Sequence, residues 1–264
     1  MALLLPNLAF LAIPLFGQHM PKAELRPETT QAFEAYAGRR EAAIRHQRIQ
    51  GRQFLWADDT SERRTRVQGG EIVIEPINTH GVIEVKGGML HDWIGAAFIP
   101  KTTLAKVLAA IQNYDNHRNL YQPEVTGSRL LSRDGDRFKV RLRLLKKKIV
   151  TVVLNTDHEI TYFPIDATHQ HSRSRTTRIA EVENPGERSE HELNPGDDHG
   201  LLWNLDTFWR FLERDGGVWI ECEAISLTRG IPVGLGWLVT PIVRDLPRES
   251  LTLTLEGTRR ALQR

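Results

Sequence analysis

Apolar and basic residues alternate in the middle of the chain, over positions 138–144, which read FKVRLRL. A period of two predicts a β-strand with one apolar and one basic face. The turn sequence Asp134-Gly135-Asp136 directly before this strand predicts a hairpin. Further strand-like runs lie at 149–154, 159–163, 172–182, 202–212 and 218–227, and a second turn at 215–217 joins the last two. The middle of the chain therefore predicts about six antiparallel strands.

Two segments show the helical period instead. After a strand over 89–99, apolar residues at positions 104, 107, 108 and 111 have the spacing of one helix face, and Thr102 or Thr103 can cap that helix. Near the end of the chain, Pro247 suits the first turn of a helix, and leucines continue an apolar stripe to position 262. We therefore expect one helix after the first strand and a long helix at the C-terminus.

The N-terminal part of the chain has weaker patterns. Positions 27–47 carry a loose apolar stripe that predicts a peripheral helix, and short strand-like runs follow at 53–57, 71–77 and 81–85. We assign residues 21–86 to an N-terminal extension and residues 87–264 to the main domain. An exposed sheet edge promotes aggregation, so we expect the extension's strands to pair with an edge of the main sheet or to pack on its outer surface.

The order of these elements predicts the fold class. A strand, a helix, about six antiparallel strands and a long C-terminal helix indicate an α+β fold. The economical packing for this order is a strongly curved antiparallel sheet with one long helix laid across it, because each element then buries its apolar face.

Two stretches carry a resemblance to a known family. Positions 107–131 read VLAAIQNYDNHRNLYQPEVTGSRLL, and positions 219–262 read WIECEAISLTRGIPVGLGWLVTPIVRDLPRESLTLTLEGTRRAL. With the strands between them, they resemble the START-like superfamily, also called the SRPBCC or Bet v 1-like group, which includes polyketide cyclase/dehydrase and lipid-transport families. The likeness covers positions 88–264, and the extension has no counterpart in it. It implies a helix-grip fold whose sheet and C-terminal helix enclose a cavity for lipids, sterols, polyketides or other apolar molecules.

Composition narrows the classes of partner. With 35 Lys and Arg against 33 Asp and Glu, the net charge is +2, which gives no overall attraction to nucleic acid or to an anionic membrane. The chain has one cysteine, Cys222. It therefore has no intrachain disulfide, no cysteine zinc cluster and no CxxC redox site.

The first sixteen residues are apolar and uncharged, and Pro6 and Pro14 interrupt them. This run is short for a membrane span and fits a signal-peptide core, with Gly17 as a cleavage position, although no Lys or Arg precedes it. We expect residues 1–20 to be a bacterial signal peptide and the processed protein to be periplasmic or secreted, without a stable membrane span. A short buried segment and an uncleaved anchor are the alternatives.

Several groups of polar residues are candidates for chemistry. His169 and His171 form an H-x-H pair, but the sequence shows no clear third metal ligand. His91 and Asp92 are adjacent on an expected strand, so they point to opposite faces. Glu221 and Glu223 share a face, and we expect them on the exterior of the sheet, paired with arginines such as Arg173, Arg175 or Arg178. Motifs of nucleotide-binding, hydrolase and metalloprotease sites are absent from the sequence. We therefore predict no catalytic residue, no cofactor and no metal.

The residues expected to line the cavity come from the last two strands and the C-terminal helix. They are Trp203, Trp209, Phe211, Ile220, Cys222, Ala224, Leu235, Leu238, Val239 and Ile242. The aromatic row at 203, 209 and 211 can equally fill the core. We expect a protein that binds or carries a hydrophobic, lipid-like or polyketide-like small molecule, and is not an enzyme. The alternatives are a cyclase/dehydrase- or hydrolase-type enzyme that uses the same cavity, and an envelope module whose extension binds a protein partner.

Overall fold

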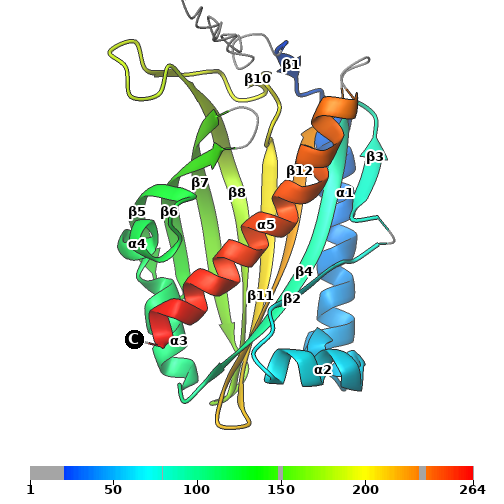
Figure 1. The fold of residues 1–264 in the computed structure, drawn as a ribbon, viewed down its shortest axis with the longest axis vertical. Helices are drawn as coiled ribbons and strands as arrows, with labels where there is room; N and C mark the ends of the chain where they lie inside the picture. Colours follow the sequence, from blue (N-terminus) through cyan, green and yellow to red (C-terminus); the bar gives the residue numbers. More distant parts are fainter. Residues whose placement is uncertain (1–20, 79, 148–150, 232–235, 264) are drawn as a thin grey trace, which may run out of the picture.

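A strongly curved antiparallel sheet is the centre of the molecule (Figure 1). The computed structural model describes residues 21–78, 80–147, 151–231 and 236–263, with side chains omitted for 236–244. The strand order is β2-β4-β12-β11-β8-β7-β6-β5, and β3 also pairs with β4. The strands are β2 (Val73–Pro76), β3 (Val82–Val85), β4 (Gly88–Pro100), β5 (Val125–Asp134), β6 (Arg137–Lys147), β7 (Thr151–Pro164), β8 (His169–Glu183), β11 (Asn204–Arg214) and β12 (Gly217–Arg229).

Helices cover both faces of this sheet (Figure 1). The long helix α5 (Gly236–Leu262) crosses the concave face, accompanied by α3 (Leu104–Gln112) and α4 (His117–Leu120). On the convex face lie α1 (Pro27–Ile44), which continues as a π-helical turn over Arg45–Ile49, and α2 (Ser61–Gln68). Short 3-10 turns occupy Trp56–Asp59 and Tyr114–Asn116. The predicted α+β helix-grip arrangement, a curved antiparallel sheet with a long C-terminal helix, is confirmed.

Helix α5 lies very close to its neighbours at two glycines. A Cβ atom on Gly95 of β4 would lie 2.6 Å from Cδ1 of Leu255, and one on Gly257 of α5 would lie 2.5 Å from the carbonyl oxygen of Leu120. Both distances are shorter than atoms tolerate. At Gly257 the contact is with a backbone atom, so only glycine allows α5 to lie this near to α4; at Gly95 the end of the Leu255 side chain would have to shift. Leu251 and Leu255 are buried there against Ala97 and Ile99 of β4.

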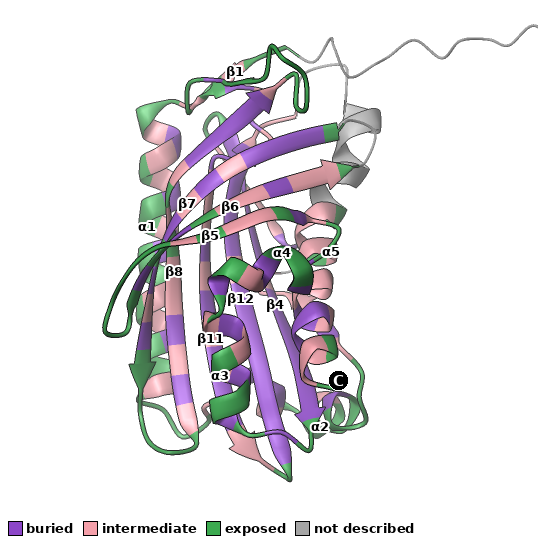
Figure 2. Cartoon of the chain, turned by 90° about the vertical axis from the view of Figure 1, so that its left-hand side faces the viewer, coloured by how far each residue is buried: buried purple, intermediate pink, exposed green. Residues whose placement is uncertain are grey.

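The N-terminal extension is built into the sheet. β2 and β3 pair with β4, as predicted for the extension's strands. On the convex face, Phe33, Ala37 and Ile44 of α1 pack with Phe208 and Ile225 of the sheet. Figure 2 shows burial running almost unbroken along β4 and β12, the strands with a helix layer on each side.

A two-stranded ribbon closes one end of the molecule. β1 (Ala23–Glu24) pairs with β10 (Asp197–Asp198), and the amide of Leu25 donates to the carbonyl of Gly196 at 2.7 Å. A further short strand, β9 (His191–Glu192), pairs with β8. The chain after Pro21 is thus fastened to the loop that precedes β11.

Three expected elements differ from the structure. The strand expected over 53–57 is wrong, because the amides of Trp56 and Ala57 donate to the Glu221 carboxylate at 3.0 and 2.7 Å rather than to another strand. The two strands expected over 149–163 are one strand, β7, within the described residues. Pro247, expected in the first turn of a helix, lies inside α5, which begins at Gly236. One missing N–H removes a single hydrogen bond, and packing of the following turns on β4 offsets it.

Among the described residues, no helix has both the length and the apolar character of a membrane span. Residues 1–20 lie outside the described part of the chain. The signal peptide and the periplasmic or secreted location therefore stay predictions.

Candidate functional site

A cavity of about 310 Å³ lies between the concave face of the sheet and α5. Small side chains on the central strands create it. Facing the cavity are Ser172 and Ser174 of β8, Thr207 of β11, and Ala224 and Ser226 of β12. Farther along the same face, large side chains fill the space instead, including Phe138, Phe211 and Ile220. The change from large to small residues therefore sets where the packed core ends and the cavity begins.

The other walls are mainly apolar. Strands β6 and β7 contribute Val140, Leu142, Leu144, Val152, Leu154 and Ile160. Helix α5 forms the roof with Leu246, Pro247, Ser250, Leu251 and Thr254. An apolar enclosure with a few polar groups is the usual form of a small-molecule site.

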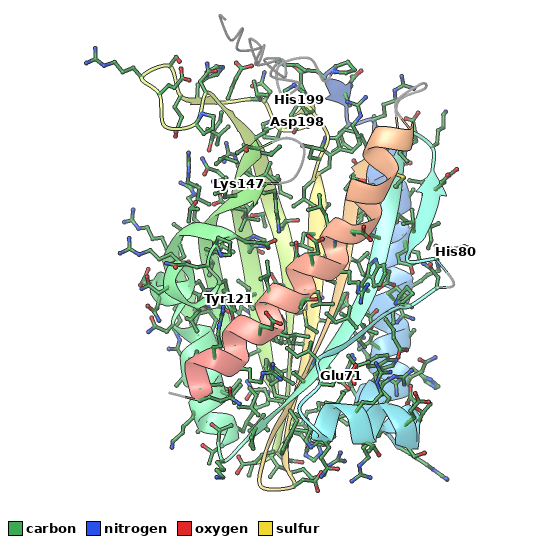
Figure 3. All side chains as sticks on the ribbon, viewed as in Figure 1. Glu71, His80, Tyr121, Lys147, Asp198 and His199 are labelled. Atoms are coloured by element: carbon green, nitrogen blue, oxygen red, sulfur yellow. The ribbon has the colours of Figure 1, made fainter. Side chains whose placement is uncertain are left out.

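Five titratable side chains line the deeper part of the cavity: Tyr114, His117, Tyr121, His158 and Tyr162. The hydroxyls of Tyr114 and Tyr162 lie 2.8 Å apart in a hydrogen bond. The His117 ring lies between those of Tyr114 and Tyr121, with centroid distances of 4.7 and 4.9 Å. Tyr121, labelled in Figure 3 beneath α5, shares a hydrogen bond of 3.2 Å with Thr258 of that helix.

Burial keeps these groups uncharged. It lowers the pKa of His117 and of His158 to about 4, because the apolar surroundings disfavour the imidazolium form. The same cause raises the pKa of Tyr121 to about 12 and that of Tyr162 well above its usual value. Near pH 7 this part of the cavity therefore offers neutral hydrogen-bonding groups only.

Hydrogen bonds between polar side chains link helix α5, the roof of the cavity, to strand β6 in its side wall. Lys146 of β6 donates to Glu124 and, at 2.6 Å, to Ser250 of α5. Ser250 donates to Glu124 at 3.2 Å. Burial lowers the pKa of Lys146, while the Glu124 carboxylate acts in the opposite direction. The paired charges thus lie at the border between the cavity and its roof without a net charge.

The structure brings together only some of the residues predicted to line the cavity. Trp209, Cys222 and Ala224 line it. Phe211 and Ile220 lie on the same face but in the filled core beside it. Trp203 is not among the lining residues. It precedes β11, so it does not share that strand's alternation; its ring packs with Phe33 and Phe208 and its indole nitrogen donates to Asp198 at 2.9 Å.

The predicted helix residues cannot be placed in the same way. Leu235 lies outside the described residues, and the side chains of Leu238, Val239 and Ile242 lie outside them as well. The described roof is one to three turns farther along α5, at Leu246, Ser250 and Thr254.

The tyrosines and histidines of the cavity were not singled out from the sequence, although a signal was present. Tyr114, His117 and Tyr121 all lie in the stretch 107–131 that carries the family resemblance. His158, Ile160 and Tyr162 share one face of β7, as the period of two requires. The pattern was hidden because the polar residues Thr156, Asp157 and His158 interrupt the apolar run of this strand.

The histidines and the aspartate that the sequence offered as candidates for chemistry make contacts within the fold instead. His169 contacts Asp166 and His171 stacks on Phe163, and no cluster of three metal-ligating side chains occurs in the described parts of the chain. His91 faces inward, where it bonds to Thr228 at 3.0 Å, whereas Asp92 faces α1.

Glu221 and Glu223 lie on the convex face of the sheet, as predicted, but they are buried rather than exterior and have different partners. Arg210 donates to Glu221 at 2.9 Å and Arg40 of α1 donates to Glu223 at 2.8 Å. The arginines that were expected there, Arg173 and Arg175, pair with Glu41 of α1 instead. Helix α1, which has no counterpart in the family pattern, supplies Arg40 and Glu41 to these pairs.

Compared by sequence, the chain matches no family model and no curated protein. Compared by structure, it is similar to a protein from Thermus thermophilus, with 15% identity and a TM-score of 0.47 over 64% of this chain and 95% of the other. It is also similar to a STAR-related lipid transfer protein from Xanthomonas axonopodis, with 16% identity and a TM-score of 0.43 over 70% of this chain and 99% of the other. Its similarity to the Zhui aromatase/cyclase from Streptomyces sp. R1128 has 11% identity and a TM-score of 0.45 over 66% of this chain and 94% of the other.

Proposed function

We propose that this protein binds a hydrophobic small molecule in the cavity between the sheet and α5. The observation that carries the proposal is the space of about 310 Å³ between the sheet and α5, with predominantly apolar walls. Pockets of roughly 300–1,000 Å³ with apolar walls and few polar groups are typical of small-molecule sites. Most of the lining is apolar, and Lys146 and Glu124 at the roof pair with each other, so burial of apolar surface supplies most of the affinity.

Native mass spectrometry of the purified protein tests this proposal. We expect the wild-type spectrum to contain a second species, heavier by the mass of one small molecule, that disappears after extraction with organic solvent and refolding. The extracted protein should then take up a neutral apolar fluorophore such as N-phenyl-1-naphthylamine with a stoichiometry of one. A protein that carries no adduct and takes up no fluorophore would contradict the proposal.

A second candidate function is acid–base catalysis on the enclosed molecule. The inward-facing group of Tyr114, His117, His158 and Tyr162 favours it, because neutral imidazoles and hydroxyls can transfer protons to and from a bound substrate. Replacing His158 with Gln distinguishes the two functions. If the protein only binds, wild type and variant should carry a molecule of the same mass; an enzyme should leave unreacted substrate, of a different mass, in the variant.

The third possibility was an extension that binds a protein partner. The apolar face of α1 is occupied by the protein's own sheet, through Phe33, Ala37 and Ile44. The strands β2 and β3 are occupied by β4. These contacts favour a structural role for the extension over partner binding.

A further inference from the structure

The sheet wall of the cavity carries hydroxyl groups that hydrogen-bond to nothing else. They belong to Ser172, Ser174, Thr207 and Ser226, which we call the hydroxyl stripe. In the described parts of the chain, none of these four side chains has a hydrogen-bond partner, although nearly all other polar side chains around the cavity have one. Since these hydroxyls line the cavity and have no protein partner among the described residues, they are available to hydrogen-bond to a molecule inside it.

The stripe runs across three neighbouring strands. Thr207 of β11 is directly opposite Ser174 of β8 in the sheet, and Ser172 is opposite Trp209. Ser226 of β12 is opposite Leu205 of β11. Because alternate residues of a strand face the same side, the four hydroxyls form one polar band that crosses the strands on an otherwise apolar concave wall.

The charged lining residues are bonded to other groups of the protein. Among the described lining residues, Lys146 and Glu124 pair with each other. The guanidinium of Arg229 donates to the carbonyl oxygens of Pro21 and His199, at 2.5 and 3.4 Å, at the end of β12. Within the described residues Arg229 has no carboxylate partner, but it lies at the end of β12. At the hydroxyl stripe itself, a charged ligand group would lose its hydration and meet only neutral hydroxyls.

We infer that the ligand is an uncharged molecule with hydroxyl or carbonyl oxygens on one side, which bond to the hydroxyl stripe, and an apolar side that faces β6, β7 and α5. This inference rests on the proposed function and adds the chemical class of the ligand. Serine and threonine hydroxyls both donate and accept hydrogen bonds, so they pair with neutral carbonyl and hydroxyl oxygens alike. The opposite wall, with Leu142, Leu144, Leu154 and Leu251, covers the apolar side of the molecule.

Three probes with one ring skeleton test the inference: fluorene, the neutral alcohol fluorenol, and fluorenecarboxylate. Their binding is measured by displacement of N-phenyl-1-naphthylamine from wild type, from a variant with Ser172→Ala, Ser174→Ala, Thr207→Val and Ser226→Ala, and from a control with Ser132→Ala. Ser132 is exposed on β5, outside the cavity. The substitutions preserve side-chain size closely, so hydrogen bonding is the main property that changes.

The expected result is a loss of fluorenol affinity in the stripe variant of about five- to ten-fold, as for one or two lost hydrogen bonds, with fluorene affinity unchanged or higher. The Ser132→Ala control should bind all three probes as wild type does. In wild type, fluorenecarboxylate should bind at least about ten-fold more weakly than fluorenol, because its charge would meet only neutral hydroxyls at the stripe.

Other results would overturn the inference in distinguishable ways. Equal fluorenol affinity in wild type and stripe variant would reject the hydroxyl stripe but leave apolar binding intact. Stronger binding of the carboxylate than of fluorenol would reject an uncharged ligand. If wild type binds none of the probes and no fluorophore, the proposed function itself fails. The comparison of the three probes on wild type decides the question of charge even if the fourfold variant does not fold, and Thr207→Val alone then tests the stripe.

Discussion

Buried charges between α1 and the sheet are the least expected feature at the scale of single residues. Asp92 and Glu223 are both almost fully buried, and one guanidinium, that of Arg40, lies 3.3 Å from the first and 2.8 Å from the second. The hydroxyl of Tyr36 donates to Asp92 at 2.7 Å. Two carboxylates therefore share one cation, so the ionised form of one of them is poorly compensated.

The protonation of Asp92 follows from this arrangement. Burial, and then the nearby Glu223 charge, raises the pKa of Asp92 from 3.8 to about 7, although Tyr36 and Arg40 act in the opposite direction. Since the folded state holds this proton more tightly than the unfolded chain does, the contribution of Asp92 to stability is complete below about pH 4. It is lost as the pH rises toward 7.

Replacing Asp92 with Asn should therefore flatten the pH dependence of stability. The amide cannot ionise and can still accept the Tyr36 hydrogen bond. Relative to wild type, the variant should gain free energy of unfolding between pH 5 and pH 8, by at most about 4 kcal/mol for a shift of this size. Urea denaturation at several pH values measures it. An exposed control, Asp134→Asn, should show the pH dependence of wild type. If Asp92→Asn instead changes the free energy of unfolding by the same amount at every pH, the raised pKa of Asp92 is contradicted.

At the scale of elements, the contact between α5 and its neighbours is decided by glycine. A Cβ on Gly257 would lie 2.5 Å from the backbone oxygen of Leu120, and a backbone atom cannot move aside as a side chain can. Gly38, on the exposed side of α1, has no atom within 4 Å of the corresponding position. The two glycines therefore predict opposite effects for the same substitution.

Gly257→Ala should lower the free energy of unfolding by about 1–3 kcal/mol, because α5 must shift away from α4. Gly38→Ala should raise it by up to about 1 kcal/mol, because alanine favours the helix without creating a contact. Chemical denaturation of the two variants under one condition provides the comparison. Equal effects in the same direction would show that the approach of α5 to α4 does not limit its position.

The elements that could be predicted from the sequence are those with an uninterrupted period. The alternation in FKVRLRL and the helical spacing from Leu104 to Ile111 correspond to β6 and α3. The errors occurred where tertiary contacts override the local pattern. The amides at 56 and 57 bond to Glu221, on a strand 164 and 165 residues away in sequence, and nothing local indicates this. The continuation of α5 through Pro247 depends likewise on packing against the sheet.

The cavity was predictable in its location but not in its lining. The order of strands and the final helix indicates a space between sheet and helix, and alternation identified Cys222 and Ala224 as inward-facing. Whether an inward position lies in the filled core or in the cavity depends on neighbours from other strands. Ile220, two residues from Cys222, packs in the core with Phe211 for this reason.

At the scale of the whole molecule, the extension and the sheet form one core. The convex face carries Ile94, Phe98 and Trp219, which pack with Leu55, Trp56 and Val67 of the extension. Without residues 21–86, this apolar surface would be exposed to water and the edge of β4 would lose its partners.

A chain truncated to begin at Gly87 should therefore aggregate or unfold. Burial of several large apolar side chains at roughly 1.5–3 kcal/mol each exceeds the margin by which domains are usually stable. Size-exclusion chromatography and circular dichroism of the truncated protein check this expectation. A monodisperse, folded chain with unchanged ligand affinity would mean that the extension is an accessory layer.

The central claim, that the cavity accommodates a molecule, is tested most directly by filling it. Ala224 lies on β12 with its side chain in the cavity, whereas Ala109 is exposed on α3. We predict that Ala224→Trp reduces uptake of N-phenyl-1-naphthylamine at least about ten-fold while the melting temperature changes little, because the indole occupies existing space. Ala109→Trp should take up the fluorophore as wild type does. If Ala224→Trp instead loses thermal stability and takes up the fluorophore like wild type, the space is part of a filled core and the protein does not bind its ligand there.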